Sequence, residues 1–205
     1  MIGWSHHEGT AVALNQESID TDQLIPARFM STPRSEGYGR FLLHDVRRDA
    51  GGSYREDVPL NRFPNASVIV ARRNFGSGSS REAAVYALVD FGIRAVLAPS
   101  FGDIFASNAV NNGLLPARIS EAQADAMIAL LGVSASPAEI DIVGQSVTVA
   151  DRTTSFDIDP VWSEKLINGW DDIDLTRNYA SEIAAFRGNL SKMQKWAFPL
   201  QETTG

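Results

Sequence analysis

The sequence contains no cysteine and only three histidines, which limits the chemistry that the chain can perform. Without cysteine it cannot form a disulfide scaffold, a thiolate zinc site or an iron–sulfur cluster held by its own thiolates. No stretch approaches the roughly 20 apolar residues of a membrane-spanning helix. The first ten residues, MIGWSHHEGT, lack the basic region and apolar run of a secretory signal. We therefore expect a soluble, cytoplasmic protein.

Positive charge is also scarce, which bears on the possible partners. The net charge is −7 at pH 7. A nucleic-acid-binding protein normally presents a basic face, so we expect no nucleic-acid partner. A small anionic substrate is still compatible with this charge, because a few arginines can create a locally positive site.

The apolar content is sufficient for a folded domain. Hydrophobic residues make up 44% of the 205 residues, and this length fits one domain. We expect a single domain over residues 1–205, with a core from about 10 to 187 and a C-terminal tail at 191–205. Residues 31–57 are rich in Gly, Ser, Arg and Asp and predict a long mobile loop, a feature that is often a functional lid.

The hydrophobic pattern predicts an α/β fold with a mixed sheet. Residues 67–72 and 94–100 are short apolar runs typical of buried strands. Between them, apolar residues recur with helical spacing from Ala84 to Phe91, and Gly92 is a typical helix C-cap. This βαβ unit makes part of the sheet parallel, and a hairpin around Gly144-Gln145 adds antiparallel strands. Further helices are predicted at 103–112, after a capping box at Ser120 and Gln123, from Asp159 to Asn168, and over 179–190.

The stretch NFGSGSSRE at residues 74–82, called the glycine loop below, is the first candidate site. A glycine loop between a strand and a helix leaves unpaired N–H groups at the helix N-terminus, where they and the helix dipole attract anions. Arg81 offers a bidentate fork for a carboxylate or phosphate, and Ser79 and Ser80 add hydroxyls. The alternative is an ordinary turn in which Ser79 caps the helix and Glu82 completes the capping box.

Several well-known motifs do not fit the glycine loop. A dinucleotide-binding fingerprint needs a third glycine where Arg81 stands, and a P-loop needs Gly-Lys-Ser/Thr. A nucleophile elbow needs Gly-x-Ser-x-Gly, and a Ser–His–Asp triad needs a histidine. Two of the three histidines, His6 and His7, lie near the N-terminus, where solvated disorder is the simpler interpretation. The glycine loop is therefore interpreted as an anion site that matches none of these motifs.

A second candidate is the aspartate pair in IDTDQ, residues 19–23. Asp20 and Asp22 occupy alternate positions, which on a strand point the same way and suit a metal or an acid–base pair. The alternative is a capped turn before the apolar residues that follow. The arginines of the 31–57 loop are compatible with solvated surface charge or with one or two contacts to an anion.

Three segments together resemble one family: SIDTDQLIPARFM at 18–30, the stretch from Val70 to Pro116, and INGWDDIDLT at 167–176. The order and spacing are similar to those of the aconitase swivelling-domain family, in particular its 3-isopropylmalate dehydratase (isopropylmalate isomerase) small subunits. The resemblance runs from about residue 10 to about 187. GSSRE at 78–82 is its most specific motif, supported by DTDQ at 20–23 and NNGLLP at 111–116.

The resemblance implies an α/β fold of the swivelling β/β/α type, with a mixed sheet and flanking helices. It implies one subunit of a two-subunit hydro-lyase that converts 2-isopropylmalate to 3-isopropylmalate in leucine biosynthesis. A partner large subunit would carry a 4Fe-4S cluster, and this chain would bind no metal or cofactor itself. The substrate would be a small di- or tricarboxylate, without nucleic acid or membrane.

The resemblance also implies roles for individual residues. The first serine of the family's Ser-Ser-Arg is the catalytic base, which is Ser79 here, and Asp22 belongs to the same catalytic site. The implied substrate-binding residues are Ser80, Arg81, Arg34 and Gly78. Helix N–H groups and Arg81 would lower the pKa of the serine, and iron lent by the partner would act as a Lewis acid on the leaving hydroxyl.

The sequence departs from the family pattern close to the glycine loop. Ser77 stands where the family often has Cys, Ala83 where it usually has His, and Val85-Tyr86 where it has Pro-Trp. These changes put the exact substrate in question more than the reaction class. One alternative is a related dehydratase acting on 2-methylmalate/citraconate, 2,3-dimethylmalate or a homoaconitate-type acid. Another is a non-catalytic anion-binding module of the same fold.

Overall fold

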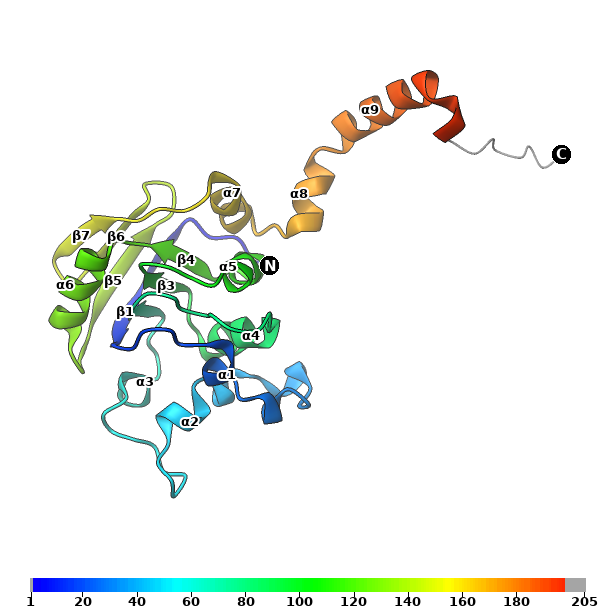
Figure 1. Ribbon diagram of the computed structural model, residues 1–205. Helices are drawn as coiled ribbons and strands as arrows, with labels where there is room; N and C mark the ends of the chain where they lie inside the picture. The colour runs from blue at the N-terminus through cyan, green and yellow to red at the C-terminus, as the bar shows by residue number, and fades with distance from the viewer. Residues whose placement is uncertain (1, 198–205) are drawn as a thin grey trace. The chain divides into compact units, whose positions relative to one another are not determined.

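A computed structural model describes residues 2–197 of the chain (Figure 1). These residues divide into two compact units, one extending to Trp170 and the other beginning at Asp171. The sequence predicted one domain with a core to about residue 187, and the second unit takes in the last helices of that range. The predicted tail at 191–205 lies partly outside the described residues.

A mixed sheet forms the centre of the first unit, as the sequence predicted. In the described residues it has seven strands in the order β4-β3-β2-β1-β5-β6-β7. Strands β1 to β4 are parallel to one another, and β5, β6 and β7 continue the sheet from β1 in antiparallel pairs. The strands are β1 (His6–Leu14), β2 (Val68–Ala71), β3 (Ala95–Ala98), β4 (Leu115–Arg118), β5 (Ala135–Asp141), β6 (Ser146–Val149) and β7 (Arg152–Ser155).

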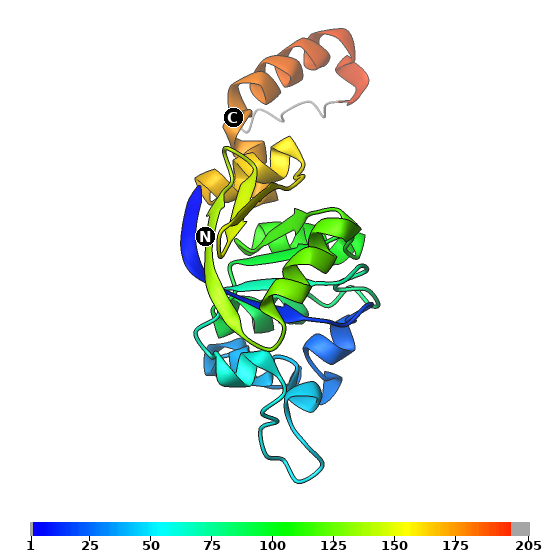
Figure 2. The same cartoon turned by 90° about the vertical axis from the view of Figure 1, so that its left-hand side faces the viewer.

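Helices pack on both faces of this sheet, and two separate apolar clusters result. Because successive strand residues point to opposite faces, Ile69 and Val96 join the first cluster and Val68 and Leu97 the second. Helix α4 contributes to the first cluster and α6 to the second. Figures 1 and 2 show where the two helices lie beside the sheet. The α-helices of this unit are α1 (Thr21–Leu24), α2 (His44–Arg47), α3 (Pro59–Arg62), α4 (Glu82–Phe91), α5 (Asp103–Asn111), α6 (Glu121–Leu131) and α7 (Pro160–Asn168).

The ends of these helices agree with the sequence prediction where it depends on residues at the helix end itself. Gly92 closes α4 in the left-handed conformation with φ +109°, as a C-cap glycine does. The capping box of Ser120 and Gln123 is present at the start of α6, and Asp159 caps α7. None of the helices in the described residues combines the length and apolar character needed to cross a membrane.

His6 and His7 correct the interpretation of a solvated, disordered N-terminus. Strand β1 begins at His6 and pairs with β5 through both histidines. The Nε2 of His7 lies 2.7 Å from Ser67 Oγ. Burial and the nearby positive charges of Arg94 and His6 lower the pKa of His7. The cross-strand partners in β5 are distant in sequence, so the terminal position of these histidines gave no sign of the pairing.

Residues 31–57 contain more regular structure than the sequence suggested. Two 3-10 helices, η2 (Arg34–Glu36) and η3 (Gly39–Phe41), follow η1 (Ala27–Phe29) and precede α2. Tyr38 and Leu42 are buried in the first apolar cluster. Residues 49–57, in contrast, are exposed. Residues 31–36 are mostly exposed as well, so the packed part of the segment is limited to residues 38–47.

Amide hydrogen exchange on the isolated chain tests this division of the segment. Leu43 is 2% exposed and its N–H donates to Leu24 O at 2.9 Å, so we expect amides of residues 41–47 to exchange slowly. We expect amides of residues 49–57 to exchange at least about 100-fold faster, because they lie at the surface with little apolar packing. Equal exchange rates in the two halves would contradict the division.

Candidate active site

The glycine loop lies at the edge of the sheet where the parallel strands end. It follows β2, and residues 19–22 follow the neighbouring strand β1. The two segments are joined by backbone hydrogen bonds, from Gly76 N–H to Ile19 O at 2.7 Å and from Thr21 N–H to Ser77 O at 2.9 Å. The carboxyl edge of parallel strands is where ligands bind in open α/β sheets.

Two glycines allow the loop to follow this path. Gly76 has φ +71°, and a Cβ there would stand 2.2 Å from the ring of Phe105. Gly78 has φ +100°, a conformation that L side chains rarely adopt, and it lies against Thr21. The glycines therefore let the chain pass between α1 and α5 and present the following serines at the surface.

Asp22 and Arg81 form an ion pair across the two segments. Asp22 lies in the first turn of α1, and its Oδ1 accepts a hydrogen bond from Arg81 Nη1. Asp20, the other member of the predicted pair, caps α1 in a capping box with Gln23, as the alternative interpretation proposed. The two aspartates thus have different roles, and only Asp22 contacts the glycine loop through its carboxylate.

Ser79 does not cap α4, so the interpretation of an ordinary Ser79–Glu82 capping box is wrong. Arg81 occupies the N-cap position, and no side chain caps the helix there. The carbonyl of Ser79 accepts hydrogen bonds from Arg81 N–H at 2.8 Å and from Thr21 Oγ1 at 3.0 Å. Ser79 and Ser80 are exposed beside the first turn of α4, in which Ala84 N–H donates to Arg81 O at 3.0 Å.

Thr21 is the residue of this site that sequence reasoning missed. It is 1% exposed, and its Oγ1 lies 3.4 Å from Ser79 Oγ as well as donating to Ser79 O. Its backbone N–H donates a hydrogen bond to Ser77 O, so Thr21 fixes the loop at two points. Its position between the two aspartates was the available sign that it belongs to the site. The sequence does not indicate that its hydroxyl contacts a serine.

Arg34 lies apart from the Asp22–Arg81 pair. Its guanidinium stacks on Tyr86 with the Cζ atom 3.6 Å from the ring centroid, and its Nη2 lies 3.4 Å from Asp90 Oδ1. Burial and a hydrogen bond to Glu82 raise the pKa of Tyr86. Both contacts are on α4, so the structure attaches Arg34 to this helix. Its proposed contact with a substrate stays a prediction.

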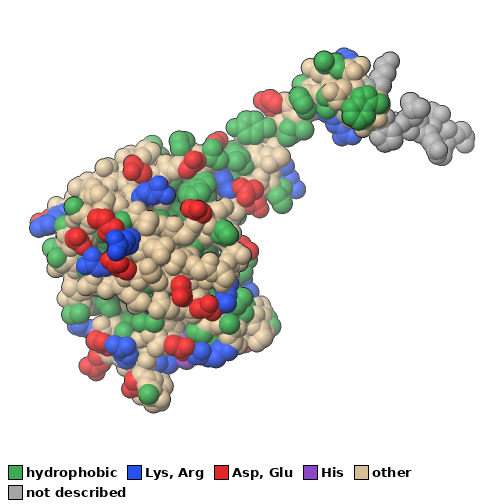
Figure 3. Space-filling view, in the orientation of Figure 1, with side chains coloured by type: hydrophobic (Ala, Val, Ile, Leu, Met, Phe, Trp, Pro, Cys, Tyr) green, Lys and Arg blue, Asp and Glu red, His purple; other side chains and the backbone are tan. Residues whose placement is uncertain are grey.

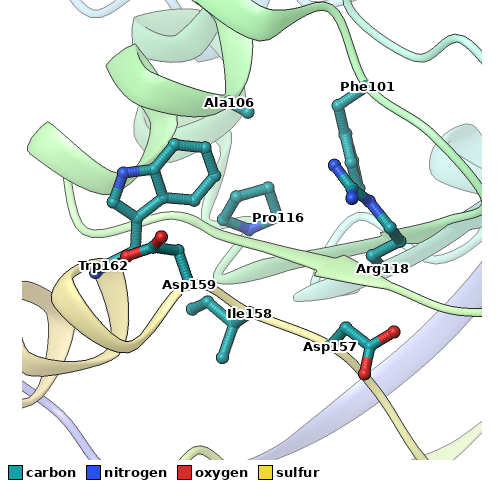
Figure 4. A pocket seen from close by; sticks show the side chains of 8 residues that line it. All are labelled: Phe101, Ala106, Pro116, Arg118, Asp157, Ile158, Asp159 and Trp162. Atoms are coloured by element: carbon teal, nitrogen blue, oxygen red, sulfur yellow. Dashed lines mark hydrogen bonds between the residues drawn. The ribbon is translucent and has the colours of Figure 1, made fainter.

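The described residues contain no cluster of three or more His, Cys, Asp and Glu side chains that could bind a metal ion. A separate cavity of about 400 Å³ lies where β4, α5 and α7 meet, and it includes none of the predicted site residues (Figure 4). Its lining includes Trp162, Pro116 and Arg118, with Phe101 beside the arginine. Phe101 also contacts Phe75 of the glycine loop, so the cavity adjoins the loop, although Ser79 does not line it.

Replacing Thr21 with valine tests how the loop is held. Thr21→Val keeps the shape of the side chain and removes the hydroxyl that binds Ser79 O. We expect the free energy of unfolding to fall by about 1 kcal/mol and exchange of the amides of residues 76–81 to accelerate. Chemical denaturation and hydrogen exchange measure these effects. Thr21→Ser, which keeps the hydroxyl, is the control, and equal behaviour of the two variants would contradict the role of the bond.

Comparisons with known proteins show which family the chain resembles. The family described as the aconitase C-terminal domain matches residues 1–122. A 3-isopropylmalate dehydratase small subunit from Shouchella clausii is 39% identical, covering 92% of this chain and 97% of the relative. A protein of the same name from Oceanobacillus iheyensis is 42% identical, covering 88% and 95%.

A solved structure supports the fold independently. The 3-isopropylmalate dehydratase structure from Methanocaldococcus jannaschii superposes with a TM-score of 0.64, covering 88% of this chain and 98% of that one. Its sequence identity is 24%, so this likeness supports the fold alone. The family match and the curated relatives carry the assignment further: the chain belongs to the aconitase C-terminal domain family, among the 3-isopropylmalate dehydratase small subunits.

Proposed function

We propose that this chain supplies the proton-transferring and carboxylate-binding half of a 3-isopropylmalate dehydratase site in leucine biosynthesis. The observation that carries the proposal is the position of Ser79 beside the Asp22–Arg81 ion pair, at the N-terminus of α4. The names of the curated relatives supply the reaction and the substrate. The substrate is then a small dicarboxylate.

The residues of the glycine loop suit the removal of a proton next to a carboxylate. The pKa of such a C–H group is high, so the base must be strong. A serine alkoxide is strong enough, and the N–H groups of α4, its dipole and Arg81 favour the alkoxide in a closed site. Ser79 Oγ then accepts the proton from the carbon in one direction and returns it in the other.

Arg81 is positioned to bind a substrate carboxylate. A guanidinium has five N–H donors in a planar fork. Asp22 takes one of these through Nη1, which fixes the plane of the group and leaves other donors for a carboxylate. The hydroxyl of Ser80 and the backbone beside Gly78 lie in the same exposed stretch. Asp22 thus orients the arginine that holds the substrate.

The partner chain follows from the same assignment. The relatives are named small subunits, and a small subunit has a large one. The 4Fe-4S cluster expected in this family does not fit the present chain, which has no thiolate to hold it. We place the cluster on the large subunit and derive no step of this chain through it.

Substrate choice is proposed to depend on α4 and the segment before it. Ala83 is partly buried at the first turn of α4, where the family usually has histidine, and a smaller side chain leaves more room beside Arg81. Arg34 is a second specificity residue in this proposal. To reach a substrate at Ser79 it has to leave Tyr86 and Asp90, so substrate binding would reorganise residues 31–57 in part.

Reconstitution tests the proposed function directly. The purified chain alone should show no hydration activity, and anaerobic addition of its cluster-loaded large subunit should produce activity on 2-isopropylmaleate. In the reconstituted enzyme Ser79→Ala should lower kcat by at least about 1,000-fold, because the base is lost. Turnover is measured by the absorbance of the unsaturated acid.

The controls separate the alternatives. Ser77→Ala removes a hydroxyl from the same loop while keeping the backbone bridge of residue 77 to Asp20, and it should retain most activity. Preference for citraconate or cis-aconitate over 2-isopropylmaleate would assign a related dehydratase. Near wild-type turnover by Ser79→Ala, or turnover by the single chain without its partner, would overturn the proposal.

A further inference from the structure

The cavity where β4, α5 and α7 meet contains none of the residues of the candidate active site, yet it has the composition of a binding site. Its volume of about 400 Å³ is within the range of small-molecule pockets. Arg118, the last residue of β4, lines it, so the cavity lies at the same carboxyl edge of the parallel strands as the glycine loop. Ligands bind along this edge in open α/β sheets.

One part of the cavity lining is apolar. Pro116 and Ala106 are buried side chains of this lining. Trp162 and Ile158 pack against the second apolar cluster and are only partly buried, so each also presents apolar surface to the cavity. This part of the lining favours a ligand with an apolar body, because binding removes apolar surface of both molecules from water.

The other part of the lining carries charges of both signs that have spare hydrogen-bonding capacity. The guanidinium of Arg118 forms no ion pair with a carboxylate of residues 2–197. Asp159 caps α7 through Oδ1, which accepts hydrogen bonds from Val161 N–H at 2.8 Å and from Trp162 N–H at 3.4 Å. Its Oδ2 accepts no hydrogen bond from the described residues. Both side chains can therefore bind a charged group of a ligand.

The two charges lie on opposite sides of the cavity. Figure 4 shows Arg118 beside Phe101 on one side and Asp159 beside Trp162 on the other, with Pro116 between them. Trp162 strengthens the preference for a cation on its side, because the face of an indole ring attracts an ammonium group. A ligand that satisfies the whole lining has a carboxylate at one end, an ammonium group at the other end and an apolar body between them.

The balance of charge argues against a dicarboxylate in this cavity. Asp157 also lines it, and the backbone N–H of Asp157 donates to Arg118 O at 2.7 Å, so two aspartates stand against one arginine there. Figure 3 shows acidic and basic side chains interspersed over the visible face of the first unit, without a broad positive surface on that face. A second carboxylate on the ligand would be repelled by the aspartates. The cavity therefore selects a different class of molecule from the dicarboxylate of the proposed function.

We infer that this cavity binds a small zwitterion whose ammonium and carboxylate groups stand at opposite ends of an apolar body, as in an ω-amino acid or an apolar dipeptide. Arg118 binds the carboxylate, and Asp159 and the face of Trp162 bind the ammonium group. Pro116 contacts the apolar body. The inference goes beyond the proposed function and does not rest on it, because none of these residues belongs to the candidate active site.

Isothermal titration calorimetry with ε-aminocaproate and the full-length chain tests the inference. We expect a Kd of about 1 mM or lower, at least about tenfold below the Kd values of caproate, hexylamine and adipate. Caproate and hexylamine each lack one of the two charges, and adipate replaces the ammonium group with a second carboxylate. Leucyl-leucine distinguishes the two sources of the ligand, because a lower Kd for this dipeptide than for ε-aminocaproate would assign the site to peptides.

Two substitutions locate the binding site. Arg118→Gln removes the positive charge, and Asp159→Asn removes the negative charge while keeping a good helix cap. Each should raise the Kd of ε-aminocaproate at least about fivefold. Arg152→Gln is the matched control, because Arg152 is an exposed arginine of β7 that does not line the cavity, and its Kd should stay within about twofold of wild type. Circular dichroism establishes that each variant keeps its helix content.

Three results would overturn the inference. The first is equal binding of ε-aminocaproate by the wild type, Arg118→Gln and Asp159→Asn, which would place the ligand elsewhere. The second is tighter binding of adipate than of ε-aminocaproate. The third is that neither zwitterion binds with a Kd of about 10 mM or lower. None of these results would affect the proposed function, because its test is turnover by the reconstituted enzyme.

Discussion

The site depends on the joining of two segments that follow neighbouring parallel strands. Residues 19–22 leave β1 and the glycine loop leaves β2, and backbone hydrogen bonds pair them at the edge of the sheet. Thr21 adds a side-chain bond to Ser79 O, and Asp22 adds the ion pair with Arg81. Each of these contacts fixes the position of one residue of the loop. Without them, a glycine-rich segment would have many accessible conformations. The register of β1 against β2 therefore determines where Ser79 lies.

The proposed function requires an acidic chain to bind an acidic substrate, and the same arrangement suits this task. The N-terminus of α4 and the guanidinium of Arg81 provide a positive field at one point of a molecule whose net charge is −7. Asp22 partly neutralises the charge of Arg81, which weakens its attraction for an anion. The same ion pair fixes the plane of the guanidinium. Arg34 contacts Tyr86 and Asp90 of the same helix. Two arginines, each paired with an aspartate, thus lie against α4.

Local signals in the sequence predicted much of this structure. The βαβ unit, the Gly92 C-cap and the Ser120–Gln123 capping box were predictable because each depends on residues close to one another in the sequence. The bond from Thr21 to Ser79 joins residues 58 positions apart, and that from Arg34 to Asp90 joins residues 56 apart. No local pattern encodes such pairs. The role of Asp20 as a cap and of Asp22 as an ion-pair partner could not be separated before the fold brought Arg81 to one of them.

The 31–57 segment and α9 (Ala180–Met193) show two ways in which a sequence pattern fails to predict burial. Polar composition suggested a loop, yet Tyr38 and Leu42 are buried in the core, because a few apolar residues suffice to anchor a segment. In α9 the apolar spacing predicted a helix with apolar residues on one face, and Phe186 on that face is largely exposed. Periodicity reports that a face is apolar without saying which chain covers it. The periodicity of apolar residues in one chain carries no information about a partner chain.

The most direct measurement is a double-mutant cycle on kcat/KM in the reconstituted enzyme, using Asp22→Asn, Arg81→Lys and the double variant. The central claim is that Asp22 acts through Arg81, so that the two residues form one unit with Ser79. The account predicts that each single change lowers kcat/KM and that the double variant loses no more than the worse single variant, because residues of one unit are not additive. Losses that multiply in the double variant would show that Asp22 and Arg81 act independently and would contradict the account.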